Sequence, residues 1–146
     1  MFRLTTFKNN HLTDAEIQIT LSQREGESRA TRFYQLKPEI ARINSLALNW
    51  TVVHFINEES PLYGCTGAEI EERQMEIMVF VKAFDDHFSN TVQQRTSYHH
   101  SDIVYGARFA PMYHRAEDMS QTVLELDKID QYDLVEMPGP ENAVTE

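Results

Sequence analysis

Six histidines and the adjacent carboxylates Glu58-Glu59 and Asp85-Asp86 are the residues of this chain with the clearest capacity for chemistry. On one strand, His99 and His100 would point to opposite faces of a sheet, so we expect that they do not bind one metal ion together. His54 stands alone on an apolar face, where a hydrogen-bonded core histidine is the commoner case. The remaining three, His11, His87 and His114, lack a metal-ligand spacing. The sequence therefore predicts no metal site.

Nucleophilic and acid–base catalysis have no better support in the sequence. The chain has no G-x-S-x-G elbow and no glycine-rich phosphate loop. Cys65 has no basic residue beside it that would activate its thiol. The carboxylate pairs Glu58-Glu59 and Asp85-Asp86 would point apart on a strand or be solvated in a turn, whereas an acid–base pair needs a desolvating pocket. We predict that the protein is not an enzyme and uses no cofactor.

The elements that position these residues have the patterns of β-strands. Residues 14–21 alternate between apolar and polar types, which predicts a half-buried strand of an antiparallel sheet. The polar residues 22–29 predict a turn, and residues 31–36 a second strand that ends at Lys37-Pro38 because proline donates no ladder hydrogen bond. The apolar face of the first strand consists of Ala15, Ile17, Ile19 and Leu21.

Two longer apolar segments, residues 45–56 and 76–84, predict the strongest strands, and the second is apolar on both faces, as a central strand would be. Further strands are predicted in three short segments, residues 90–97, 103–111 and 121–126. Thr66 and Glu69 have the spacing of a capping box, which predicts one short helix. Short strands with turn signals and one small helix together predict an all-β sandwich.

Length and charge limit the class of protein further. The 146 residues suit one domain, which we place at residues 1–137, with residues 138–146 as a disordered tail. The net charge of −10 argues against a nucleic-acid partner and against a polybasic membrane-surface module. No apolar run approaches the about 18 residues of a membrane-spanning helix, so we expect the chain itself to be soluble.

Three motifs in order resemble the cytoplasmic C-terminal domain of inward-rectifier potassium channels. They are His54 with Ser60-Pro61-Leu62-Tyr63, the run Gln93-Gln94-Arg95-Thr96-Ser97-Tyr98, and the run Tyr105-Gly106-Ala107-Arg108-Phe109-Ala110-Pro111. The resemblance covers about residues 3–115. It implies an immunoglobulin-like β-sandwich of the E-set type. It also implies a homotetramer that surrounds a K⁺ path at the cytoplasmic face of the cell membrane, below the transmembrane pore domain of the same channel. Departures such as Lys82 and Tyr105 suggest a prokaryotic member.

The resemblance gives the loop after the central strand a particular role. In the family this loop approaches the fourfold axis and forms a constriction called the G-loop. The corresponding residues here are His87, Phe88, Ser89, Asn90 and Thr91. Small polar side chains would leave room for a hydrated cation, and Phe88 would either pack behind them or narrow the passage by dewetting. The alternative is an ordinary hairpin loop without a pore.

Charged positions are implied in the same way. Asp14, Lys82 and Asp86 correspond to pore-lining positions, where carboxylates would hold cations and polyvalent blockers. Lys82 stands where strong rectifiers carry a carboxylate, so we expect weak rectification. Lys8 corresponds to a rim position that contacts anionic lipid head groups, with an ordinary surface lysine as the alternative.

The remaining family positions are interpreted as structural or subunit-interface residues: His54, Arg95, Tyr98 and Arg108. For Arg95 we expect a buried ion pair, with Asp86 or Asp102 as the partner. Two other functions stay open for the whole chain. One is a soluble immunoglobulin-like binding or adaptor module without a pore. The other, less favoured, is a metal-dependent double-stranded β-helix enzyme, which needs two histidines two residues apart that this chain lacks.

Overall fold

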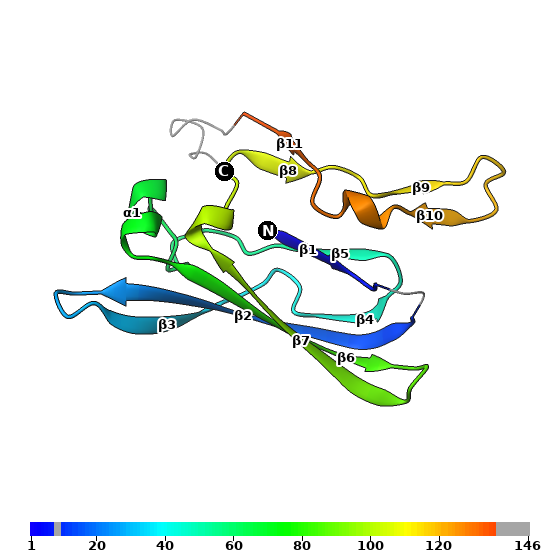
Figure 1. Cartoon of the computed structure of the whole chain (residues 1–146), viewed down its shortest axis with the longest axis horizontal. Helices are drawn as coiled ribbons and strands as arrows, with labels where there is room; N and C mark the ends of the chain where they lie inside the picture. Colours follow the sequence, from blue (N-terminus) through cyan, green and yellow to red (C-terminus); the bar gives the residue numbers. More distant parts are fainter. Residues whose placement is uncertain (8–9, 137–146) are drawn as a thin grey trace. The chain divides into compact units, whose positions relative to one another are not determined.

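The structure is a computed structural model that describes residues 1–7 and 10–136. These residues form two compact units, Met1–Ile103 and a second one that begins at Val104, and each is described by itself. The sheets of both units are antiparallel, and strands dominate the described chain (Figure 1). The predicted all-β fold class is therefore confirmed.

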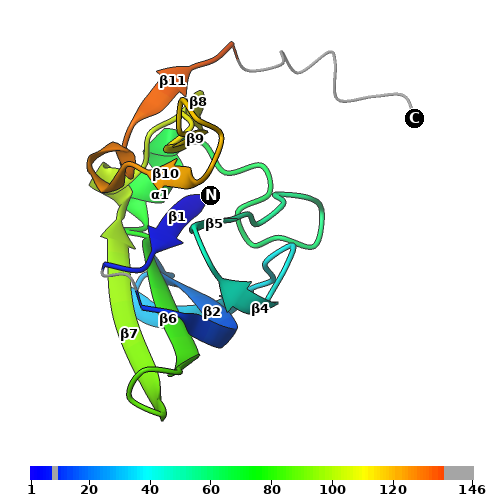
Figure 2. The same ribbon diagram turned by 90° about the vertical axis from the view of Figure 1, so that its right-hand side faces the viewer.

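The first unit consists of two layers of strands. Its larger sheet has the order β3-β2-β6-β7, and β4 also pairs with β2. Figure 2 shows the small second sheet, β1 with β5, lying over one face of the larger one. The bounds are β1 (Phe2–Thr5), β2 (Leu12–Glu25), β3 (Ala30–Leu36), β4 (Arg42–Leu46), β5 (Asn49–Val52), β6 (Glu76–Asp85) and β7 (Asn90–His99), with helix α1 (Gly67–Glu72) and the 3₁₀ turn η1 (His100–Asp102).

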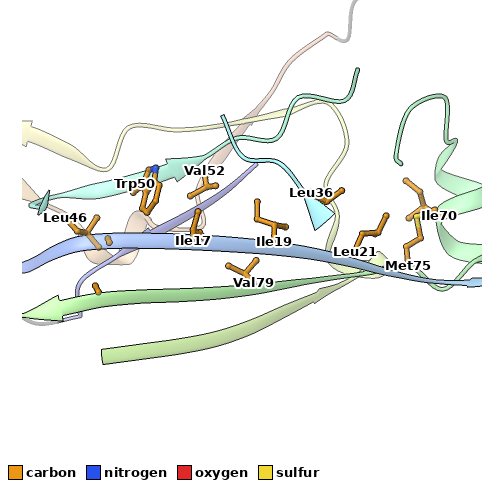
Figure 3. Close-up of a cluster of buried hydrophobic side chains, with 12 residues drawn as sticks. Ile17, Ile19, Leu21, Leu36, Leu46, Trp50, Val52, Ile70, Met75 and Val79 are labelled. Atoms are coloured by element: carbon orange, nitrogen blue, oxygen red, sulfur yellow. The ribbon is translucent and has the colours of Figure 1, made fainter. Parts of the chain in front are cut away.

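The core lies between these two layers. Ile17 and Leu21 of β2 point to the same side of the larger sheet, Ile17 toward Val52 and Leu21 toward Leu36 and Met75, and both are buried (Figure 3). Val79 of β6 is buried beside them. Trp50 and Val52 of β5 close the core from the other side. The alternation predicted for residues 14–21 thus places its apolar side chains inside, as a two-layer sandwich requires. The opposite face of the larger sheet, which we call the outer face, carries the charged and polar partners of these positions.

The first predicted turn is much shorter than residues 22–29. β2 continues to Glu25, which pairs with Ala30 of β3, and only residues 26–29 turn. Gly26 and Arg29 take positive φ angles of 70° and 50°, which reverse the chain. Ser22 and Gln23 are buried although their side chains are polar. The predicted turn was too long because polar residues do not by themselves end a strand. Pairing with β3 carries β2 through the polar residues 22–25.

The single strand predicted for residues 45–56 is wrong. The chain leaves the larger sheet after β4 and enters the small sheet as β5, with a break at Ala47 and Leu48. Thr5 Oγ1 donates a hydrogen bond of 2.6 Å to the Leu48 carbonyl oxygen at this corner. Side chains alternate every two residues in both sheets, so the alternation of apolar residues does not reveal that the chain passes from one sheet to the other. β5 then ends at Val52, four residues before the predicted end.

The central strand and the helix agree with their predictions. β6 pairs with β2 on one side and β7 on the other. The Thr66 backbone N–H donates to Glu69 Oε2 at 2.8 Å, and the Glu69 N–H donates to Thr66 Oγ1 at 3.3 Å, so the predicted capping box forms. It starts α1, whose Ile70 is buried in the core.

The second unit contains two small antiparallel ribbons. β8 (Ala107–Phe109) pairs with β11 (Tyr132–Leu134), and β9 (Tyr113–Arg115) pairs with β10 (Thr122–Leu124); the 3₁₀ turn η2 (Leu126–Lys128) links them. The strands predicted for residues 103–111 and 121–126 are therefore only three residues long each. The predicted tail, residues 138–146, lies outside the described residues.

Candidate functional site

The turn between β6 and β7 is shorter than the predicted constriction loop. Asp86 to Ser89 form the turn, whereas Asn90 and Thr91 already belong to β7. Asp85, only 3% exposed, stabilises the turn from its base. Its Oδ1 accepts hydrogen bonds from the backbone N–H groups of His87 at 2.8 Å and Phe88 at 3.3 Å. Such aspartate-capped turns form readily, which explains why this segment reverses tightly.

Phe88 projects from the turn into solvent. Its side chain is 66% exposed, and its ring packs edge-on against the ring of His87, with the centroids 4.7 Å apart. Ser89 follows with a positive φ of 51°. The turn thus presents an aromatic side chain at its tip.

His11 joins this turn to two other segments. Its Nδ1 lies 2.7 Å from Asp86 Oδ2, and its Nε2 lies 2.9 Å from Ser45 Oγ in β4. The Asp86 backbone N–H also donates to the His11 carbonyl oxygen at 3.3 Å. No local sequence pattern connects His11 with Asp86, because the two residues are 75 positions apart.

The two other predicted pore-lining residues, Asp14 and Lys82, lie near the same end of the sheet, where Leu12 pairs with Asp85 and Glu16 with Lys82. A β-bulge between Thr13 and Glu16 puts Asp14 at a positive φ of 49°. Arg42 Nη2 donates to Asp14 Oδ1 at 3.3 Å. Lys82 lies across the ladder from Glu16, with Nζ 4.0 Å from Glu16 Oε2.

We call these four residues, Asp14, Glu16, Arg42 and Lys82, the outer-face charge group. Each residue in it is a partner in an ion pair, and the two acids and two bases cancel. This group therefore adds no net charge to the outer face. Asp86 adds one further carboxylate, which is paired with His11.

The buried ion pair predicted for Arg95 is wrong. Arg95 is exposed on the outer face, and its guanidinium lies over the Phe80 ring, 5.3 Å from the centroid. The two carboxylates proposed as its partners are engaged elsewhere: Asp86 with His11, and Asp102 Oδ2 with the backbone N–H of His99 at 2.8 Å. Position 95 faces outward because it stands directly opposite Phe80 in the β6–β7 ladder.

Tyr98 lies on the inner face of the same strand. It is half-buried, and its ring centroid lies 5.8 Å from that of Phe2 in β1. Burial raises the pKa of the Tyr98 hydroxyl. Tyr98 therefore contributes to the core of the first unit.

His54 forms hydrogen bonds through both ring nitrogens, as expected for a structural histidine. Nδ1 donates to the Lys37 carbonyl oxygen at 2.7 Å, because that oxygen can only accept. Nε2 is 2.8 Å from Ser60 Oγ, and that oxygen also accepts the Leu62 backbone N–H at 3.2 Å. His54 thus links the turn that begins at Ser60 to the end of β3. This contact explains why the motif has a histidine six residues before the serine.

The remaining predicted positions lie outside the core and the turn, or outside the described residues. Arg108 is exposed in β8, opposite Asp133 of β11. Lys8 lies outside the described residues.

The rings of His99 and His100 lie 4.3 Å apart, so the expectation that they point to opposite faces is wrong, because the strand ends at His99. Among residues 1–7 and 10–136, no group of three or more potential ligands is arranged to hold a metal ion.

None of the helices in the described part of the chain combines the length and the apolar character needed to cross a membrane. The fold and the site define a β-sandwich domain with a capped hairpin turn beside a paired charge group. The family model of the inward rectifier potassium channel C-terminal domain matches residues 1–145, and the chain belongs to this family. The resemblance noted in the sequence is confirmed.

Relatives of bacterial and animal origin agree with this assignment. The inward rectifier potassium channel Kirbac3.1 of Paramagnetospirillum magnetotacticum is 26% identical over 131 residues, covering 88% of this chain and 44% of the relative. The inward rectifier potassium channel irk-1 of Caenorhabditis elegans is 29% identical over 134 residues, covering 85% and 25%. The human G protein-activated inward rectifier potassium channel 1 is 26% identical, covering 100% and 30%. The chain thus spans less than half the length of each of these relatives.

Proposed function

We propose that this chain is the cytoplasmic vestibule and gating domain of a tetrameric inward-rectifier potassium channel. It lines the cytoplasmic K⁺ path and acts on the gate of the transmembrane pore domain of the same channel. Family membership supports the class of protein. The observation that carries the finer proposal is the convergence of Asp14, Lys82 and Asp86 at one end of one sheet, where Leu12 pairs with Asp85.

A ring of four turns would explain the geometry of this end. A loop near a fourfold axis places four copies of each of its side chains around one opening. Phe88, exposed at the tip, would then form an apolar ring that closes by dewetting, and Ser89 follows it as the last residue of the turn, directly before β7. Rigid positioning by Asp85 favours such a role, since a constriction needs a fixed diameter.

The charges predict a weakly attractive vestibule. The outer-face charge group is neutral in each copy, so only the Asp86 region adds negative charge near the turn. Polyvalent cations would therefore be held weakly, in keeping with weak rectification. The proposed partners are three further copies, K⁺ in transit, the pore domain, and anionic lipid head groups at the rim.

Thiol crosslinking tests whether the turns meet. In a Cys65→Ser background, Ser89→Cys places a thiol in the β6–β7 turn, and Ser28→Cys places one in the β2–β3 turn at the opposite end of the sheet. We expect a short bismaleimide to link Ser89→Cys copies and to leave Ser28→Cys copies unlinked. Light scattering up to millimolar protein should show tetramers, because assembly follows mass action.

A monomer at every concentration, together with equal crosslinking of both variants, would contradict the proposal. It would favour instead the soluble immunoglobulin-like binding or adaptor module.

A further inference from the structure

We infer that His11 is a positioning residue that clamps the β6–β7 turn to the start of β2 and to β4. The role of that turn as a constriction rests on the proposed function, whereas the clamp itself does not.

The clamp joins three segments through one side chain. The His11 ring contacts Asp86 Oδ2 at 2.7 Å and Ser45 Oγ at 2.9 Å, both within hydrogen-bonding distance. Asp86 lies in the turn and Ser45 in β4, so the imidazole spans the end of the sheet. Each partner holds a different nitrogen, which fixes the plane of the ring as well as its position.

The backbone reinforces the same connection. The Asp86 N–H donates to the His11 carbonyl oxygen at 3.3 Å, and Asn10 Nδ2 donates to Asp85 Oδ2 at 3.4 Å. Asp85 in turn holds the backbone of His87 through its other oxygen. The residues directly before β2 therefore contact both the base and the first residue of the turn. A shift of this segment would move the turn with it.

The donors and acceptors of the three groups fit the two contacts of the clamp. The Asp86 carboxylate only accepts hydrogen bonds, so Nδ1 of His11 carries the proton in that bond. The Ser45 hydroxyl can both donate and accept, so it is a suitable partner for Nε2. The two contacts are thus chemically compatible and together support the turn.

Serine, histidine and aspartate in this order also form the triad of serine hydrolases. The side chains of His11 and Asp86 are 58% and 46% exposed, however, so water surrounds the base. Acyl transfer at such a triad relies on oxyanion donors in a site that excludes water. The exposure therefore favours positioning over catalysis.

Hydrogen exchange of individual backbone amides tests the clamp in the whole chain. His11→Phe keeps a ring and removes both hydrogen bonds, and we expect amides 86–89 to exchange about three- to tenfold faster, since each net hydrogen bond contributes about 0.5–1.5 kcal/mol. Amides 26–29, in the turn at the other end of the sheet, are the internal control and should not change. His11→Asn, whose side-chain N–H can replace Nδ1–H, should retain much of the protection, and Ser45→Ala should lose part of it.

The outcomes separate the clamp from the proposed function. Unchanged exchange at residues 86–89 in His11→Phe, or an equal increase in both turns, would overturn the clamp. Faster exchange confined to residues 86–89, without crosslinking of Ser89→Cys, would support the clamp and contradict the ring of four turns. Hydrolysis of p-nitrophenyl acetate that disappears in Ser45→Ala would overturn the assignment to positioning, because it would make the three residues catalytic.

Discussion

At the scale of single residues, the electrostatics of this domain depend on pairing more than on the identity of one side chain. Lys82 is a cation on the outer face, but Glu16 stands opposite it across the ladder with its oxygen 4.0 Å away. Both side chains are about half exposed, so the pair contributes about 0–1 kcal/mol to folding. The pair therefore matters mainly for the electrostatic potential around the sheet. Variants at these two positions should fold normally.

Charge exchange at this pair gives a sharp prediction. In a full-length channel that carries this domain, Lys82→Glu should strengthen block by cytoplasmic polycations, because it leaves two carboxylates side by side in each copy. The double variant Glu16→Lys/Lys82→Glu restores a neutral pair, and block should return to the original level. Channel currents at several polycation concentrations measure this. Strong block in the double variant would mean that only the side chain at position 82 faces the ions, and no effect of Lys82→Glu would mean that it does not face them.

At the scale of elements, the short helix α1 depends on its first turn. Six residues form few internal hydrogen bonds, so the capping box of Thr66 and Glu69 and the burial of Ile70 hold the helix. Hydrogen bonds from the backbone and side chain of Thr66 lower the pKa of the Glu69 carboxyl. The charged form is thus favoured in the folded state.

This cap predicts a contribution of Glu69 to acid stability. Because its pKa is lower in the folded state than in the unfolded state, the stabilisation is present above the ordinary glutamate pKa and is lost as pH falls through the lowered value. Glu69→Gln should therefore flatten the acid side of the melting-temperature profile, measured by circular dichroism from neutral to acidic pH. Glu71→Gln is the control, because Glu71 lies two residues further along α1 and takes no part in the capping box. An identical profile for wild type and Glu69→Gln would contradict the role of the cap.

At the scale of the whole first unit, stability comes from the single core between the two layers. Leu21 of β2 is fully buried there, among side chains of both sheets and α1. The clamp and the charge group lie at the exposed end of the same sheet. The frame that positions the turn is thus the packed core, and the polar contacts adjust the turn on it.

Core truncation tests this frame. Leu21→Ala should lower the free energy of unfolding by about 2–5 kcal/mol, because it removes buried apolar contact and leaves a cavity. Phe33→Ala, on β3 with 64% of its side chain exposed, should change it by within about 0.5 kcal/mol. Urea unfolding followed by tryptophan fluorescence reports both, since Trp50 lies in the core. Equal losses for the two variants would contradict the two-layer core.

The sequence by itself determined the strands β2, β6 and β7, the capped helix and the family, because alternation, capping and short motifs are local and survive without the fold. Through the family resemblance it also predicted that Asp14, Lys82 and Asp86 belong to one site. The tertiary structure alone decided the break between β4 and β5, the outward position of Arg95 and the contact of His11 with Asp86. These depend on strand register and on one bulge between Thr13 and Glu16, which bring together residues as many as 75 positions apart. A pattern that repeats every two residues is the same in either layer and carries no information about which distant strand will lie beside it.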